Sequence, residues 1–171
     1  VRAASSFQVI WNRDRSASIS SWCGDTRHDL RGWLPGDGHL MVRSGPGRRI
    51  GVFGGTFDPP HIGHLVAAVD AHRELDLDVV LLVVANVPWQ KVGAREISPA
   101  ADRLALVRAA VADAPFLQVS DIEIRRGGPS YTADTLAELH RDEPDAELFV
   151  ILGNDAAAGF ATWERYEEVA E

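Results

Sequence analysis

Cysteine is almost missing from this 171-residue chain, and its scarcity limits how the fold can be stabilised. Cys23 is the only cysteine, so no internal disulfide can form. A chain without disulfides fits a reducing compartment. No apolar run is long enough to cross a membrane, and the N-terminus lacks a basic segment followed by an apolar stretch. We therefore expect no signal peptide, no membrane partner and a cytoplasmic location.

An excess of positive charge is also missing. The chain has 17 Lys and Arg against 25 Asp and Glu, a net charge of −8. Broad nucleic-acid binding needs a basic surface, so no nucleic-acid partner is expected. The length and the apolar content of 46% fit one globular domain with a sizeable core.

The charge is distributed unevenly along the chain. Residues 1–49 carry eight basic and four acidic side chains, whereas residues 50–171 carry nine and 21. The first segment shows no useful helical or strand periodicity. We expect residues 1–47 to be a disordered or non-native extension, with Met41, the sole methionine, as a candidate start. A genuine flexible arm is the alternative, and residues 48–171 form the predicted domain.

From residue 49 onward, strand and helix patterns alternate. Short apolar or alternating runs predict strands at 49–53, 78–84, 117–124 and 147–152. Apolar residues at helical spacing predict helices at 62–75, 99–112, 132–141 and 163–171. This alternation is typical of an α/β fold with a parallel sheet between two helical layers. Ligands then bind beyond the carboxyl ends of the strands. Arg103 is interpreted as a charge on the outer face of its helix.

The most informative segment is the glycine turn between the first strand and the first helix of the domain, Gly54-Gly55-Thr56-Phe57-Asp58-Pro59-Pro60-His61-Ile62-Gly63-His64. Its glycines let the backbone approach phosphate oxygens, and the start of a helix favours an anion. His61 and His64 are three residues apart, so they share one face of the helix. The segment predicts a nucleotide triphosphate site. Asp58, which precedes two prolines, is expected to cap the helix.

The same segment resembles the signature of the nucleotidyltransferase superfamily, (His/Thr)-x-Gly-His. Its Gly-Gly-Thr-Phe-Asp-Pro-x-His form is similar to that of the bacterial nicotinate mononucleotide adenylyltransferases. Three later segments resemble elements of that family and keep their order: Pro129-Ser130-Tyr131-Thr132-Ala133-Asp134-Thr135-Leu136, Gly153-Asn154-Asp155 and Thr162-Trp163-Glu164. The resemblance covers residues 48–171.

The resemblance implies a Rossmann-like three-layer nucleotidyltransferase fold and assigns roles by position. His64, with His61, would be catalytic and would stabilise charge that develops on the α-phosphate and the leaving group. ATP would contact Gly54, Gly55, Thr56, Phe57, His61, Gly63, His64, Lys91, Gly153 and Asp155. The mononucleotide would contact Asn86, Lys91, Thr132, Trp163 and Glu164. Mg²⁺ would bridge the ATP phosphates, held mostly by nucleotide and water, so no metal-ligating residue is assigned.

The implied reaction is adenylyl transfer from ATP to nicotinate mononucleotide. It gives nicotinate adenine dinucleotide and pyrophosphate, a step in NAD biosynthesis. Phosphoryl transfer needs mainly positioning and charge stabilisation, so no covalent nucleophile is required. The expected partners are ATP and nicotinate mononucleotide, and a homo-oligomer is left open.

Three alternatives stand beside this interpretation. The family's C-terminal Ile-Ser-x-Thr-x-x-Arg motif has no match, so the C-terminal part is expected to be missing, and the chain could be a nucleotide-binding but inactive fragment. A sister adenylyltransferase could use nicotinamide mononucleotide or phosphopantetheine; the segments at 129–136 and 162–163 argue against phosphopantetheine. A tRNA synthetase shares the first motif, but the chain is far too short for one.

Overall fold

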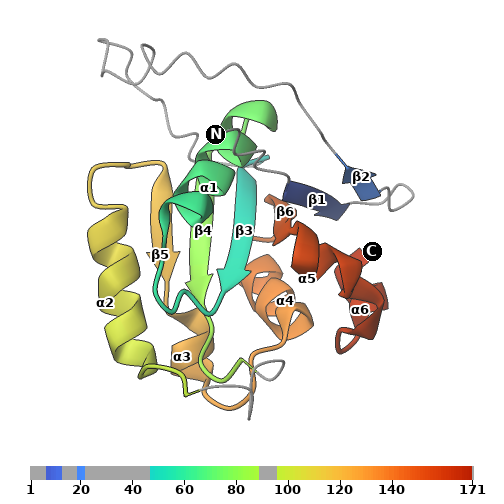
Figure 1. The fold of residues 1–171 in the computed structure, drawn as a ribbon. Coiled ribbons are helices and arrows are strands. Elements are labelled where there is room, and N and C mark those ends of the chain that lie inside the picture. The colour runs from blue at the N-terminus through green and yellow to red at the C-terminus, as the bar shows by residue number, and fades with distance from the viewer. Residues whose placement is uncertain (1–6, 13–18, 22–46, 89–95, 171) are drawn as a thin grey trace.

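The computed structural model describes residues 7–12, 19–21, 47–88 and 96–170. The strands are β1 (Phe7–Asn12), β2 (Ile19–Ser21), β3 (Arg49–Gly55), β4 (Val79–Val84), β5 (Leu117–Ser120) and β6 (Glu147–Gly153). The helices are α1 (Ile62–Glu74), α2 (Ala100–Ala110), α3 (Ile122–Arg126), α4 (Thr132–Asp142), α5 (Asn154–Ala158), the 3₁₀ turn η3 (Phe160–Thr162) and α6 (Tyr166–Ala170). Figure 1 shows their arrangement.

One twisted sheet runs through the molecule in the order β2-β1-β6-β3-β4-β5. The four strands β6, β3, β4 and β5 are parallel, as the alternation of strands and helices predicts. Each connection between them passes through at least one helix, because parallel neighbours require a crossover. The predicted Rossmann-like α/β fold is therefore confirmed for this part of the sheet.

Two short strands, β1 and β2, lie within residues 1–47, the predicted disordered or non-native extension. Strand β1 pairs antiparallel with β6 over its whole length, from Phe7 opposite Gly153 to Asn12 opposite Leu148, and β2 pairs with β1. Backbone N–H and C=O groups make this pairing, and hydrophobic periodicity does not report on them. The assignment of residues 1–47 to a separate extension stays a prediction.

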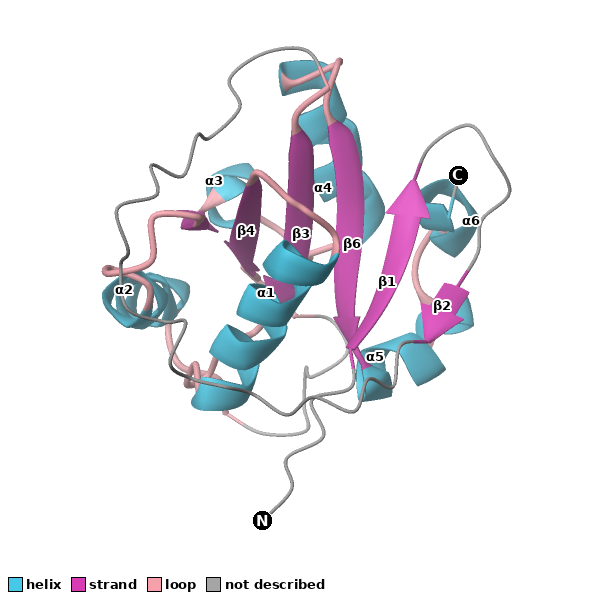
Figure 2. Ribbon diagram, turned by 90° about the horizontal axis from the view of Figure 1, so that it is seen from above, coloured by secondary structure: helices cyan, strands magenta, loops and turns pink. Residues whose placement is uncertain are grey.

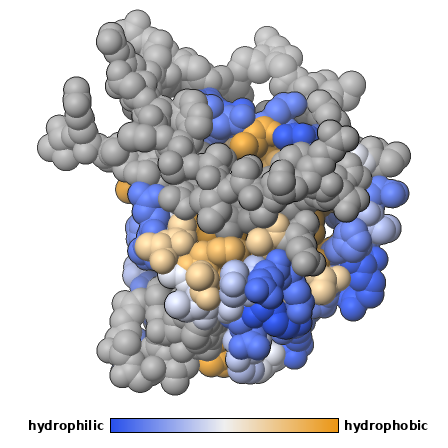
Figure 3. Space-filling view, turned by 90° about the vertical axis from the view of Figure 1, so that its right-hand side faces the viewer, coloured by the Kyte–Doolittle hydropathy of each residue, from blue (hydrophilic) through white to orange (hydrophobic). Residues whose placement is uncertain are grey.

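Helices cover both faces of the sheet (Figures 1 and 2). One core lies under α1 and α2 and includes Phe53, Phe57, Leu82, Val107 and Ile151. The opposite core, under α3, α4 and α6, is built largely from the alternate strand residues, such as Val52, Val83 and Val150. Because successive strand side chains point to opposite faces, the strands must be apolar along their whole length. On the face that carries α5 and α6, hydrophilic and hydrophobic side chains are interspersed (Figure 3).

Most predicted elements are present with ends shifted by one or two residues, but the strand predicted at 117–124 is wrong in its second half. Strand β5 ends at Ser120, and α3 begins at Ile122. The apolar alternation changes phase here, since Leu117 and Val119 are followed by Ile122 and Ile124. The predicted helix at 163–171 is also shorter, because α6 covers only Tyr166–Ala170. Among the described residues, no helix has both the length and the hydropathy that a membrane span requires.

Gly51 shows how closely neighbouring side chains pack against β3. A Cβ atom at this position would lie 2.7 Å from Leu77 Cδ1 and 2.9 Å from Ile151 Cδ1. Leu77 and Ile151 are themselves buried, so neither side chain can move freely. Three residues further along the same strand, a Cβ at Gly54 would meet no atom within 4 Å.

We therefore expect Gly51→Ala to lower the free energy of unfolding by about 1–3 kcal/mol, because the added methyl group overpacks the core. Gly54→Ala is the matched control in the same strand and should change stability by less than about 0.5 kcal/mol. Urea titration followed by circular dichroism measures both. Equal stability of the two variants would contradict the packing around Gly51.

Candidate active site

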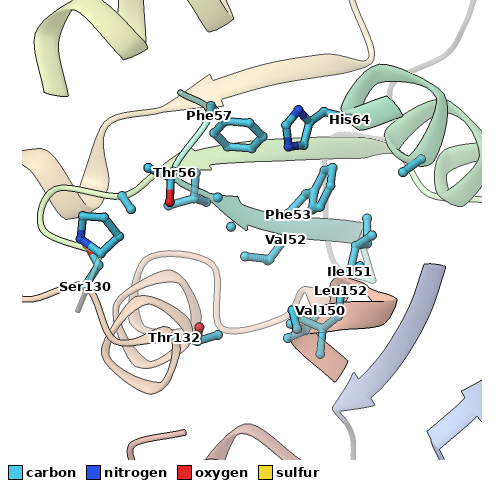
Figure 4. Close-up of a pocket in the computed structure, with 18 of the residues that line it drawn as sticks. Val52, Phe53, Thr56, Phe57, His64, Ser130, Thr132, Val150, Ile151 and Leu152 are labelled. Carbon is cyan, nitrogen blue, oxygen red and sulfur yellow. The ribbon is translucent and has the colours of Figure 1, made fainter. Parts of the chain in front are cut away.

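A cavity of about 990 Å³ opens at the carboxyl ends of β3, β4 and β6. Parallel strands bring their carboxyl ends, and the loops that follow them, to one edge of the sheet. Figure 4 shows His64 beside Phe57 at one side of the cavity and Thr132 at the opposite side. The cavity lining includes most residues predicted to bind ligand: Gly54, Gly55, Thr56, Phe57, His61, Gly63, His64, Thr132, Gly153, Asp155, Trp163 and Glu164.

The turn after β3 is shaped by the ring of Phe57. This residue has a φ of 50°, in the left-handed region that non-glycine residues rarely adopt, and its side chain is 1% exposed. Its ring lies 5.9 Å from that of Phe53 in an edge-to-face contact. A Cβ atom on Gly55 would lie 2.9 Å from Phe57 Cζ, so only glycine fits there. Gly54, by contrast, is exposed and leaves its backbone open toward the cavity.

Two stacked imidazoles stand at the start of α1. The rings of His61 and His64 have centroids 3.7 Å apart and an interplanar angle of 30°. The backbone N–H of His61 donates to His64 Nδ1 at 3.2 Å. Since Nδ1 is an acceptor, the neutral His64 ring carries its proton on Nε2 and can donate it to a ligand. Gly63 avoids a tight contact here, because a Cβ would lie 3.1 Å from His61 Nδ1.

The sequence predicts that Asp58 caps α1, and this prediction is wrong. The N-cap residue is His61. The Asp58 carboxylate instead accepts a hydrogen bond from the backbone N–H of Ser98 at 3.1 Å. It therefore ties the turn after β3 to the segment that leads into α2.

Arg103 is the largest correction to the sequence-based prediction. It was expected on the outer face of its helix, yet it is 1% exposed. Its guanidinium donates to three backbone carbonyls: Ser98 O at 2.8 Å, Thr56 O at 2.7 Å and Asn86 O at 3.1 Å. Burial lowers the pKa of Arg103 from its ordinary value, and the charge of Asp58 acts in the opposite direction.

Asn86 was predicted to bind the mononucleotide, but it does not line the cavity. Its side-chain amide donates to Gly128 O at 2.9 Å, and its backbone N–H donates to Ser130 Oγ at 2.9 Å. Ser130 N–H returns a hydrogen bond to Val87 O at 3.0 Å. These bonds join the loop after β4 to the loop before α4, and the contact of Asn86 with the mononucleotide stays a prediction.

A buried carboxylate lies beneath the start of α4. Glu123 is 6% exposed, lines the cavity, and accepts a hydrogen bond from Thr135 Oγ1 at 2.7 Å. Burial raises the pKa of Glu123 above its ordinary value, although hydrogen bonds from Ser130 and Thr135 and the charge of Arg126 oppose this shift. Sequence reasoning missed Glu123 because it was assigned to a strand rather than to α3.

The remaining wall of the cavity follows β6. A Cβ atom on Gly153 would lie 2.8 Å from Asp155 Oδ1, so the glycine leaves room for this exposed carboxylate. Trp163 is partly buried, and its indole Nε1–H has no hydrogen-bond partner among the described residues. Glu164 follows it at the surface. Lys91 lies outside the described residues.

The described residues contain no group of three or more His, Cys, Asp or Glu side chains that could hold a metal ion. The polar groups of the cavity are instead donors and carboxylates distributed along its walls. The arrangement suits a polyanionic nucleotide at the end formed by Gly54, His61 and His64. A second, aromatic ligand fits the end formed by Thr132 and Trp163.

Comparisons with known proteins identify the family. The cytidylyltransferase-like family matches residues 52–171. The chain belongs to the cytidylyltransferase-like family. Two relatives are each named "Probable nicotinate-nucleotide adenylyltransferase". The protein from Saccharopolyspora erythraea is 48% identical over 124 residues, which cover 72% of this chain and 58% of the relative. The protein from Corynebacterium kroppenstedtii is 50% identical over 121 residues, covering 71% and 57%.

The predicted resemblance to nicotinate mononucleotide adenylyltransferases is confirmed by these identities. The chain spans somewhat more than half the length of these curated relatives. Among solved structures, the nicotinic acid mononucleotide adenylyltransferase of Plasmodium falciparum, complexed with NaAD, superimposes with a TM-score of 0.60. It is 15% identical, and the match covers 71% of this chain and 60% of that one. This likeness supports the fold.

Proposed function

We propose that the protein transfers the adenylyl group of ATP to nicotinate mononucleotide, giving nicotinate adenine dinucleotide and pyrophosphate in NAD biosynthesis. The observation that carries the proposal is that the stacked pair of His61 and His64 faces the same cavity as Thr132 and Trp163. The names of relatives at 48–50% identity agree with this chemistry.

The phosphate end of the cavity would hold ATP. A backbone that is open at Gly54 and the amino-terminal turn of α1 suit phosphate oxygens, because helix N-termini favour anions. His64 Nε2–H would donate to an oxygen bound to the α-phosphorus, where negative charge develops. Mg²⁺ would enter as part of the Mg·ATP substrate, held mostly by phosphate oxygens and water.

The reaction itself would be an in-line displacement. An oxygen of the mononucleotide phosphate forms a bond to the α-phosphorus of ATP, and the bond to the β-phosphate oxygen breaks. The electron pair leaves with pyrophosphate. Because a phosphate monoester is already ionised near neutral pH, no protein base is needed to generate the nucleophile. The protein acts by positioning and by charge stabilisation.

The opposite end of the cavity would hold the pyridine ring and its carboxylate. The amino-terminal turn of α4 begins at Thr132, where a carboxylate is stabilised by the helix dipole. Trp163 offers a flat partner for a cationic pyridinium ring. Lys91 and Glu164 are proposed as further ligand contacts on the basis of the family resemblance.

The second candidate is nucleotide binding without activity, which the open backbone at Gly54 and the start of α1 would supply by themselves. Pyrophosphate release with Mg·ATP separates the two, measured with nicotinate mononucleotide and, in parallel, with nicotinamide mononucleotide. We expect turnover with the nicotinate form. ATP binding without turnover on either substrate would support the inactive fragment, and faster turnover with nicotinamide mononucleotide would reverse the assigned preference.

His64→Ala should lower kcat by at least about a hundredfold, because a donor to the developing charge is lost. Thermal unfolding should change little, since His64 is only partly buried. His140→Ala, at an exposed histidine of α4, is the matched control and should keep normal kcat. Near-normal turnover of His64→Ala would remove this residue from the catalytic step.

Gly54→Ala should weaken ATP binding by at least about tenfold, because its methyl group would occupy the space offered to the phosphates. Isothermal titration calorimetry with Mg·ATP measures the effect. Gly159→Ala is the control, since its Cβ would make only an ordinary contact at 3.8 Å outside the cavity. Unchanged ATP affinity in Gly54→Ala would place the phosphates elsewhere.

A further inference from the structure

The two ends of the cavity are joined by one continuous chain of hydrogen bonds. At the phosphate end, Arg103 Nη1 donates to the carbonyl oxygen of Thr56, which belongs to the turn that carries Gly54 and Gly55. Through Nη2 the same guanidinium donates to the carbonyl oxygen of Asn86. One buried side chain thus fixes the turn after β3 relative to the loop after β4.

From Asn86 the chain continues toward α4. The N–H of Asn86 donates to Ser130 Oγ at 2.9 Å, and Ser130 lies two residues before Thr132, the first residue of α4. Within α4, Thr135 Oγ1 donates to the Glu123 carboxylate of α3. Arg126 donates to the same Thr135 oxygen at 3.0 Å. Ser130, which accepts from Asn86, therefore links the start of α4 to the loop after β4.

We propose that Arg103 is a positioning residue that couples the binding of the two substrates, a role that rests on the proposed adenylyl transfer. Arg103 is not among the residues that line the cavity, so it acts through Thr56 and Asn86. A ligand that orders the turn at Thr56 also orders the loop at Asn86 and, through Ser130, the start of α4. The second ligand then loses less conformational entropy on binding.

Only the shape of a guanidinium satisfies this arrangement. Arg103 presents Nε, Nη1 and Nη2 to three separate carbonyl oxygens in one buried position. A lysine ammonium keeps the charge but has a single nitrogen on a flexible stem, so it cannot span the acceptors of Thr56 and Asn86 together. The substitution Arg103→Lys therefore separates the geometry of the side chain from its charge.

The test measures the coupling directly. The Kd of a non-hydrolysable ATP analogue with Mg²⁺ is determined by calorimetry on the full chain, with and without saturating nicotinate mononucleotide. In the unmodified protein we expect the mononucleotide to tighten analogue binding by at least about fivefold, the lower range of coupling between sites. In Arg103→Lys this factor should fall below about twofold, while each ligand alone binds within about threefold of normal.

A matched control lies on the same helix. Arg108 is exposed and pairs with Asp121 at 3.6 Å, so Arg108→Lys should keep the full coupling factor. Retention of normal coupling by Arg103→Lys, or absence of coupling in the unmodified protein despite turnover, would overturn the proposal. Absence of both turnover and mononucleotide binding in the unmodified protein would overturn the proposed function, and this inference with it.

Ser130→Ala provides a second route if Arg103→Lys fails to fold. It removes the hydroxyl that accepts from Asn86 N–H but keeps the backbone bond from Ser130 to Val87. We expect normal affinity for the analogue alone and a coupling factor reduced below about twofold. A weaker affinity for the mononucleotide with unchanged coupling would show that Ser130 only contacts substrate, and would overturn the proposal.

Discussion

The site depends on one buried cation that binds neutral backbone. Arg103 donates to carbonyl oxygens of Thr56, Asn86 and Ser98, which belong to three segments far apart in the sequence. Backbone bonds from Ala85 to Gly55 and between Val87 and Pro129 lie beside these segments, but the carbonyl oxygens of Thr56 and Asn86 take the guanidinium as a common partner. The guanidinium supplies its donors in one rigid group. The turn after β3 and the loop that borders α4 are thereby tied to the same side chain.

A second constraint is the burial of the sheet on both faces. Strands β3, β4 and β6 alternate between two cores, so their side chains have no room for polar chemistry within the sheet. Polar groups lie instead where these strands end. The glycines at these ends have different roles. Gly54 opens its backbone to the cavity, Gly55 makes room for Phe57, and Gly153 makes room for Asp155. Part of the cavity wall is thus backbone at the carboxyl ends of these strands.

Much of this arrangement could be predicted from local pattern. The continuous apolar runs at 79–84 and 148–152 are typical of buried strands, and the glycine turn before His61 and His64 is typical of a phosphate site. Arg103 was misread because its charge was given more weight than its position. It lies four residues before Val107 and next to Leu104, on the buried stripe of α2. The pairing of Asn86 with Ser130 joins residues 44 apart, and no local pattern encodes such a contact.

The electrostatics of the cavity follow from where each charge is buried. The chain has a net charge of −8, and the carboxylates of Asp58, Glu123, Asp155 and Glu164 all line the cavity. At the phosphate end, the Asp58 carboxylate is bound by Ser98 N–H and lies near the charge of Arg103, which offsets it. At the opposite end, burial raises the pKa of Glu123 and so favours its neutral form. Burial thus acts oppositely on the charge available at the two ends of the cavity: it disfavours the cation of Arg103 near Asp58 and disfavours the anion of Glu123 beneath α4.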